Sequence, residues 1–187
     1  VRVEASIKVP LAFLPIIGIH EVTIRSDAES EAASLDLVMI LDNSPSMAYD
    51  DINNNPLPAG DPMRDPNNCN PINNCYPFEK VKAAAIELAS RLYYPYDRVG
   101  IVTYSRYGVL ETDLDDCVLG DPAAEQQCVV NRINSLTVEV PVTSCPFSPY
   151  FHGCTMTNIS AAVAQAHLLF ANQGRPDALW VAVIVSD

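Results

Sequence analysis

Asp42 is followed by hydroxyl residues two and four positions later, Ser44 and Ser46, in the stretch LDLVMILDNSPSM (residues 35–47). Two more oxygen-bearing residues stand at segment boundaries later in the chain: Thr157 opens an amphipathic segment, and Asp187 ends an apolar one. Carboxylates and hydroxyls are the ligands that hard divalent cations prefer, Mg²⁺ above all, with Mn²⁺ or Ca²⁺ as alternatives. If the five side chains meet at one point, the chemistry they support is cation binding.

Hydrophobic patterning predicts the elements that would position these residues. Nearly continuous apolar runs over residues 35–42, 97–105 and 178–187 are typical of strands buried on both faces, as in parallel sheets. Helices are predicted over 78–92, 121–136 and 157–174, and a shorter, more polar strand over 108–114 is expected at an antiparallel edge. The last helix is expected to bury one stripe, Ile159, Ala162, Val163, Ala166 and Phe170.

This alternation of strands and helices predicts an α/β fold with an open, doubly wound, mostly parallel sheet and helices on both faces. In such sheets, ligands bind outside the carboxyl ends of the strands, where the strand order reverses. The strands that end at Asp42 and Asp187 are therefore expected to be neighbours there. A long polar excursion, residues 49–76, is rich in Asn, Asp and Pro and is expected to be a loop insertion.

Residues 1–34 have a different character from the rest of the chain. VRVEASIKVP and HEVTIRSDA alternate apolar and polar residues, which predicts two half-buried strands joined by a helix or turn over LAFLPIIGI. We therefore divide the chain into a β-rich appendage with its linker, residues 1–34, and an α/β domain, residues 35–187. The longest apolar run, residues 10–19, is too short to cross a bilayer.

Charge and cysteine content narrow the class of protein. Lys and Arg total 11 against 23 Asp and Glu, for a net charge of -12, which argues against nucleic acid and anionic membranes as partners. The six cysteines form three close couples, so we predict the disulfides Cys69–Cys75, Cys117–Cys128 and Cys145–Cys154 and an oxidising compartment. Free thiols are the alternative. A zinc site is disfavoured because no CxxC spacing occurs.

Three segments together resemble the von Willebrand factor A domain family. DNSPS matches its DxSxS signature at Asp42, Ser44 and Ser46, TNISAAV resembles its threonine segment at Thr157, and VIVSD resembles its second aspartate strand at Asp187. The resemblance implies a metal-ion-dependent adhesion site in which the serines and the threonine bind the ion directly and the aspartates act largely through water. A protein ligand would complete the ion's shell with a carboxylate.

The chain departs from that family at two points. Pro45 stands inside the signature where a small flexible residue is usual, which stiffens the loop without removing a ligand. The family's sheet also has further strands and helices after the second aspartate, so the domain is expected to be incomplete at its C-terminus. The strand over 178–187 should then expose its edge, leave Val181, Val183 and Val185 short of cover, and allow self-association.

The appendage followed by such a domain resembles bacterial TadE/TadG-type pilus-assembly proteins, on the segments VPLAFLPIIGI and DAESEA. This resemblance implies an extracytoplasmic domain, periplasmic or at the cell surface, held by a membrane helix upstream of the given sequence. The protein would then be a binding or adhesion module of a pilus or surface apparatus.

Several alternatives stay open at this stage. Asp42, Ser44 and Ser46 could form a capped turn, Thr155 could replace Thr157, and Thr157 could be a plain helix cap. A structural assembly protein with a vestigial metal site and a metal-dependent hydrolase are the rival functions. We expect no enzyme, because no histidine belongs to these segments to activate a serine. The acidic part of the insertion, from Asp50 to Asp65, could hold calcium, although it lacks EF-hand spacing.

Overall fold

The computed structural model describes residues 2–10, 21–29, 33–141 and 157–186. The chain divides into two compact units, residues 1–33 and 34–187. Among the described residues, no helix is both long and apolar enough to span a membrane.

The first unit is an antiparallel hairpin of β1 (Arg2–Pro10) and β2 (Glu21–Glu29). Its register places Ile7 opposite Ile24 and Val9 opposite Val22, so the apolar residues of both strands share one face, as the alternation predicted. The expected half-burial is wrong, however, because Ile7 is 62% exposed. A two-stranded ribbon has no second layer of its own against which to bury a face.

The second unit is built on a four-stranded sheet of order β5-β4-β3-β6. β3 (Leu35–Asp42) lies between β4 (Arg98–Tyr104) and β6 (Leu179–Val185) and is parallel to both, whereas β5 (Gly108–Thr112) pairs antiparallel with β4. The predicted fold class and the predicted antiparallel edge strand are both confirmed. The two strands that precede the candidate aspartates are neighbours, as expected.

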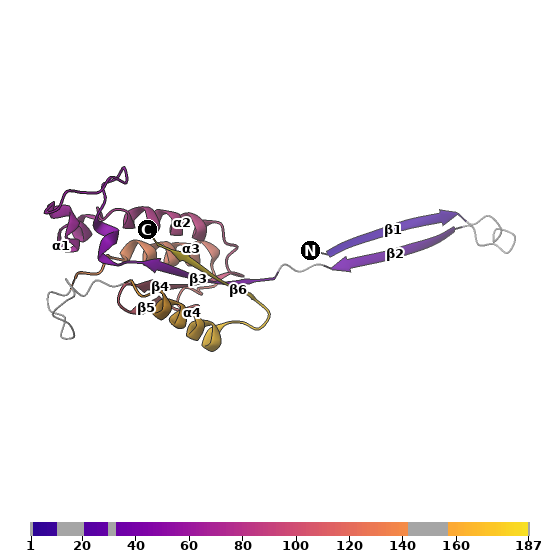
Figure 1. Cartoon of the computed structure of the whole chain (residues 1–187). Helices are drawn as coiled ribbons and strands as arrows, with labels where there is room; N and C mark the ends of the chain where they lie inside the picture. Colours follow the sequence, from indigo (N-terminus) through magenta and orange to yellow (C-terminus); the bar gives the residue numbers. More distant parts are fainter. Residues whose placement is uncertain (1, 11–20, 30–32, 142–156, 187) are drawn as a thin grey trace. The chain divides into compact units, whose positions relative to one another are not determined.

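Helices cover both faces of this sheet (Figure 1). α2 (Phe78–Ser90) and α3 (Pro122–Ser135) lie on one side, over a core that includes Leu37, Met39 and Leu41 of β3. α4 (Ile159–Gln173) lies on the other side, over a core that includes Val38 and Ile40. Alternate residues of β3 therefore enter two cores, which is why its apolar run is continuous.

The buried stripe of α4 differs from the expected one. The helix buries Ala162, Ala166 and Leu169, while Ile159 and Val163 are each 45% exposed. The contact stripe is thus rotated toward Leu169, which packs beside Gly100 of β4 so closely that a Cβ at Gly100 would lie 2.6 Å from its Cδ2 atom. The absence of a side chain at Gly100 lets the helix approach the sheet at this position.

Strand β6 forms one edge of the sheet, as predicted, but the exposure is distributed differently from the expectation. Val181, Val183 and Val185 are partly buried against the α2 and α3 side of the core. The more exposed residues are Trp180 and Ile184, each 47% exposed, on the alternate positions. The three valines therefore keep some exposure, as expected, but less than the alternate positions, because they pack against the core that β3 shares with α2 and α3.

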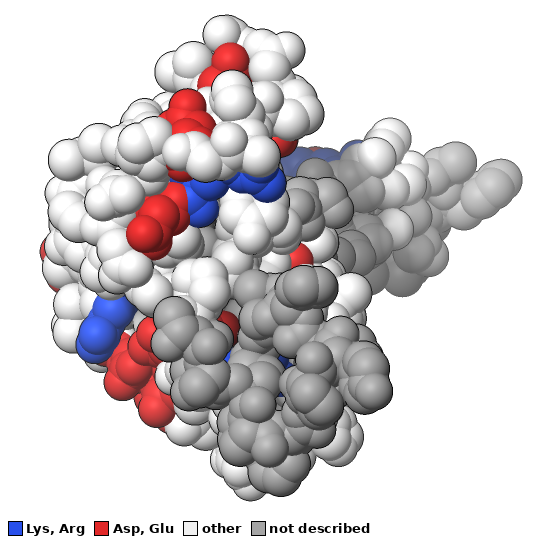
Figure 2. All heavy atoms as spheres, turned by 60° about the vertical axis from the view of Figure 1, so that its left-hand side comes forward, with Lys and Arg blue, Asp and Glu red and all other residues white. Residues whose placement is uncertain are grey.

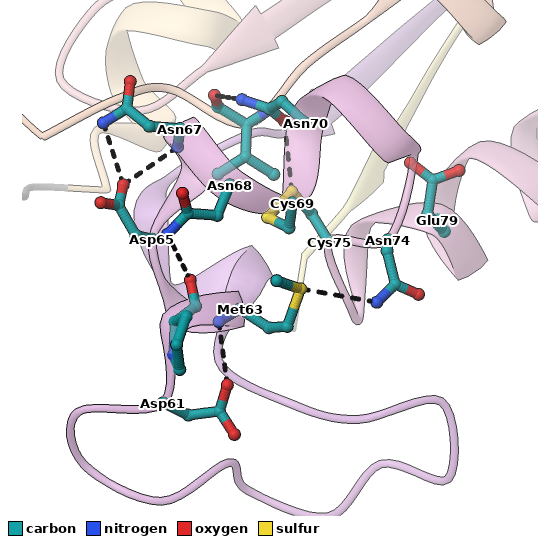
Figure 3. The surroundings of a disulfide bond; sticks show 12 residues. Asp61, Met63, Asp65, Asn67, Asn68, Cys69, Asn70, Asn74, Cys75 and Glu79 are labelled. Atoms are coloured by element: carbon teal, nitrogen blue, oxygen red, sulfur yellow. Dashed lines mark hydrogen bonds between the residues drawn. A yellow bond between two sulfur atoms is a disulfide. The ribbon is translucent and has the colours of Figure 1, made fainter.

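The insertion between β3 and α2 consists of short helical turns: η2 (Pro45–Ala48), η3 (Pro62–Arg64), α1 (Pro66–Cys69) and η4 (Asn70–Ile72). The Cys69–Cys75 disulfide links α1 to the approach to α2 (Figure 3), and Cys117–Cys128 links the loop before α3 to the helix itself. These two predicted pairings are confirmed. The third, Cys145–Cys154, lies outside the described residues.

Candidate metal-binding rim and its neighbouring cavity

Asp42 is the last residue of β3 and its side chain is fully buried, with 0% of the residue exposed. One carboxylate oxygen, Oδ1, accepts a hydrogen bond from the backbone N–H of Ser44 at 2.8 Å. The other, Oδ2, accepts one from the Ser186 hydroxyl at 2.8 Å. The carboxylate is thus held by neutral donors from the loop after β3 and from the residue after β6. We call this end of β3, β4 and β6, with the loops that follow them, the rim.

Ser44 and Ser46 lie together in the loop that leaves β3. Ser44 is the extended residue before η2, and Pro45 occupies the first position of that turn, where its fixed φ is compatible with a helical start. The two hydroxyl oxygens are 3.0 Å apart and share a hydrogen bond. Pro45 therefore does not separate the serines. The structure brings Asp42, Ser44 and Ser46 to one place.

Thr157 is exposed and lies one residue before the N-cap of α4. The cap itself is Asn158, whose Oδ1 atom accepts from the N–H of Ala161 at 3.1 Å, so Thr157 is not a plain helix cap. The N–H of Asn158 donates to the Ser105 carbonyl at 2.6 Å, which ties this helix start to the loop after β4. Thr157, the residue before Asn158, therefore lies close to the loop after β4, which is part of the rim. Its alternative, Thr155, lies outside the described residues.

Asp187 also lies outside the described residues, but its predecessor is placed. β6 runs parallel to β3 with Val185 opposite Leu41, so Ser186 follows at the level of Asp42 and donates to its carboxylate. Sequence reasoning missed Ser186 as a contact of Asp42. The signal for it was the alignment of the two apolar runs from their leucines: with Leu35 opposite Leu179, Ser186 falls opposite Asp42.

The donors gathered at the rim are carboxylate and hydroxyl oxygens. Among the described residues, no group of three or more His, Cys, Asp and Glu side chains is placed to hold a metal ion. No lysine or arginine in the described ranges forms an ion pair with Asp42. A fully buried carboxylate is costly without a countercharge or hydrogen bonds, and among the described residues Asp42 has two neutral donors, the Ser44 N–H and the Ser186 hydroxyl. The donor set fits a hard divalent cation better than a soft one.

Two asparagines fix a backbone segment, residues 137–140, against the rim. The carbonyl of Asn43 accepts from the N–H of Glu139 at 2.7 Å, and its side-chain amide donates to the Thr137 carbonyl at 3.3 Å. Asn70 of the insertion forms two hydrogen bonds with the backbone of Val138. Its Nδ2 donates to the Val138 carbonyl at 2.9 Å and its Oδ1 accepts from the Val138 N–H at 3.0 Å. Asn70 lies within the loop closed by the Cys69–Cys75 disulfide (Figure 3).

Beside this segment lies a cavity of about 290 Å³ next to Asn43. Its lining combines the carboxyl end of β4, the adjoining strand β5, Asn70 and the segment of residues 137–140, which we call the braced segment. The lining offers hydroxyl groups and two carboxylates, from Thr103, Ser105, Tyr107, Glu111 and Glu139. Figure 2 brings the α1 side of the molecule forward and shows acidic side chains in several groups, some of them next to basic ones.

The acidic insertion uses its carboxylates for local turns. Asp51 accepts main-chain hydrogen bonds from Asn53 and Asn55. The bond from the Asn55 backbone N–H is the main reason why the pKa of the Asp51 carboxyl lies below its ordinary value, and the bond from Asn53 adds to it. Asp61 and Asp65 each accept from the N–H two residues later. These are the hydrogen bonds of Asx turns and N-caps. The calcium alternative stays a prediction.

No family model matches the chain, and no curated protein matches it. Among solved structures, the chain is similar to the conserved hypothetical protein BatB from Bacteroides thetaiotaomicron, with 16% identity and a TM-score of 0.49. That match covers 80% of this chain and 52% of BatB. It is also similar to the pilus adhesin RrgA from Streptococcus pneumoniae, with 16% identity, a TM-score of 0.47, and coverage of 83% of this chain and 20% of the adhesin. The chain thus spans about half of the first structure and a fifth of the second.

Proposed function

We propose that the protein is a metal-ion-dependent binding or adhesion module whose ion, Mg²⁺ or in its place Mn²⁺ or Ca²⁺, is held at the rim. The residues that would hold it are Asp42, Ser44, Ser46, Thr157 and Asp187. The observation that carries the proposal is the fully buried Asp42 carboxylate, with no ion pair among the described residues, beside two serine hydroxyls 3.0 Å apart.

The residues of this chain have separate tasks in such a site. The Ser44 N–H and the Ser186 hydroxyl hold the Asp42 carboxylate in one orientation. The hydroxyls of Ser44 and Ser46 offer neutral oxygens, which bind a cation without cancelling its charge. A bound ion would supply the positive charge that attracts a carboxylate of a protein partner. Binding, not turnover, is what these groups support, so we propose no enzymatic activity.

The setting that we propose is extracytoplasmic, periplasmic or at the cell surface. Two disulfides among the described residues support an oxidising compartment. A place in a pilus-assembly apparatus of the TadE/TadG type, with an anchor upstream of the given sequence, remains part of the proposal and rests on the sequence resemblance. The rival function is a structural assembly protein with a vestigial metal site, and the same experiment separates the two.

The test is Mg²⁺ binding by titration calorimetry on the wild-type chain and on Asp42→Asn. The substitution removes the negative charge and keeps a side chain of similar size with a carbonyl acceptor. Asp177→Asn is the matched control, because Asp177 is an exposed carboxylate in the loop before β6, at the opposite end of that strand. We expect binding in the wild type and the control and its loss in Asp42→Asn. Equal binding by all three proteins would mean that the rim is a capped turn, and no binding by any would favour the vestigial site.

A further inference from the structure

The cavity beside Asn43 has a fixed acidic group in its lining. The Thr103 hydroxyl donates a 2.6 Å hydrogen bond to the Glu111 carboxylate. Thr103 is only 1% exposed, so its hydroxyl is a fixed donor inside the sheet. Glu111 itself is exposed and reaches the cavity from the edge strand β5. Its carboxylate is therefore positioned but still accessible to a ligand.

A second carboxylate, that of Glu139, also lines the cavity and comes from the segment of residues 137–140. Glu139 forms an ion pair with the Arg106 guanidinium at 3.7 Å, so its charge is partly balanced and Glu111 is the carboxylate of the lining with no ion pair among the described residues. The cavity lining thus contains two carboxylates, hydroxyls and amide groups, and among the described residues that line it there is no lysine or arginine. At about 290 Å³ the cavity is at the small end of ligand pockets, which suits one long side chain better than a free drug-sized molecule.

We infer that this cavity accepts a cationic side chain, lysine or arginine, of the protein partner that binds at the rim, with Glu111 as the specificity-determining residue. The inference rests on the proposed function for the identity of the ligand as a protein, but not for the cavity or its charge. This cavity is a separate site from the group of Asp42, Ser44 and Ser46 at the rim. A partner that uses both would present a basic residue close to an acidic one.

The inference is tested with a small probe that carries only the relevant group. N-acetyl-arginine amide has a guanidinium and no other charge, and N-acetyl-citrulline amide is its neutral counterpart of nearly the same shape. Each is titrated into the ¹⁵N-labelled chain in the presence of EDTA, with the amide resonances of Thr103, Glu111 and Glu139 as the readout. We expect saturable shifts at these residues with the arginine probe and weaker ones with citrulline. Equal responses to the two probes, or none, would overturn the inference.

Two variants assign the effect to the cavity. Glu111→Gln should weaken arginine-probe binding by about threefold, the scale of a solvent-accessible charge pair. Glu87→Gln on α2 is the matched control, since it removes an exposed carboxylate that is paired with Arg91 and does not line the cavity. Unchanged binding in Glu111→Gln would overturn its assigned role. Because EDTA is present, Asp42→Asn should bind the probe like the wild type, so failure of the metal proposal and failure of this one give different results.

Discussion

Strand β3 carries a buried aspartate near each end, and the two have opposite surroundings. Asp36, near the amino end, accepts paired hydrogen bonds from the Arg98 guanidinium and further ones from the guanidinium and N–H of Arg175. Asp42, at the carboxyl end, accepts from one N–H and one serine hydroxyl. Both residues are 0% exposed.

The difference separates a structural ion network from a candidate binding site. Arg98 comes from β4 and Arg175 from the loop between α4 and β6, so Asp36 joins three parts of the chain. Burial alone would raise the pKa of Asp36, but the hydrogen bonds from Arg98 and Arg175 outweigh it and hold the pKa below its ordinary value. Its charge is already compensated within the fold. Asp42 has no such compensation among the described residues, which is what a cation site requires.

The largest expected effect is therefore on stability, at the amino end of β3. Asp36→Asn should lower the free energy of unfolding by about 3–5 kcal/mol, because it removes a fully buried carboxylate that pairs with two partly buried guanidinium groups, Arg98 and Arg175. Asp42→Asn should cost much less, since its partners are neutral donors that the amide can partly satisfy. Urea unfolding followed by circular dichroism measures both. Equal losses would show that the two aspartates play the same structural role.

The same contrast predicts a dependence on pH. Because the folded-state pKa of Asp36 is lowered, its contribution is fully present above the unfolded-state value, about 3.9. That contribution is lost as the pH falls below this value and through the folded-state pKa. The wild type should therefore lose stability relative to Asp36→Asn between about pH 4 and lower pH. Acid titrations of unfolding in the two proteins test this, and parallel curves would contradict it.

The carboxyl end should respond to metal instead. A ligand that binds only the folded state stabilises it by about 2.7 kcal/mol at a hundredfold excess over its Kd. Mg²⁺ should thus raise the unfolding temperature of the wild type and of Asp177→Asn but not that of Asp42→Asn. Thermal scans with Mg²⁺ and with EDTA provide the comparison. A shift of equal size in Asp42→Asn would place the ion elsewhere in the molecule.

Sequence patterns predicted the framework of the site well because the framework depends on local chemistry. The apolar run of β3 predicted its burial on both faces, and the helix predicted over residues 121–136 is α3, which begins at Pro122 with the Asp121 carboxylate accepting from the N–H of Ala124. Two disulfides followed from short cysteine spacing. Each of these signals operates over a few residues.

What could not be predicted depends on contacts between distant segments. Lys82 is only 3% exposed although helix patterns treat lysine as a surface residue, because its ammonium donates to the Asn134 and Leu136 carbonyls at the end of α3 and pairs with Glu79. The hydrogen bonds between Asn70 and Val138 join residues 68 positions apart, so no local sequence pattern indicates them. Both residues line the cavity, so its walls come from segments that are distant in the sequence.

A smaller effect is expected from the insertion that braces the rim. Asn70→Ala removes both hydrogen bonds to Val138, which at a net value of about 1 kcal/mol each should cost about 1–2 kcal/mol. The specific readout is hydrogen exchange at the Val138 amide, which should accelerate much more than at Leu37 in the sheet. Asn68→Ala is the control, since Asn68 is in the same insertion and its side-chain amide donates to the Pro62 carbonyl, away from Val138. Unchanged exchange at Val138 would show that Asn70 does not brace the segment.

The smallest expected effect is on self-association, and it depends on which of the two edge strands, β5 or β6, can pair with another chain. β5 is short, has a register shift against β4 and carries Glu111, features that discourage pairing with another chain. β6, with the sequence LWVAVIV, has no charged residue, and its exposed Trp180 and Ile184 flank an edge with no strand beyond it among the described residues. We expect weak self-association of the chain through β6, visible by sedimentation at high concentration. Ile184→Lys should reduce it, and Leu110→Lys on the exposed face of β5 should not, because a charge matters only at the edge that pairs. A wild type that stays monomeric at every concentration would exclude this use of the edge.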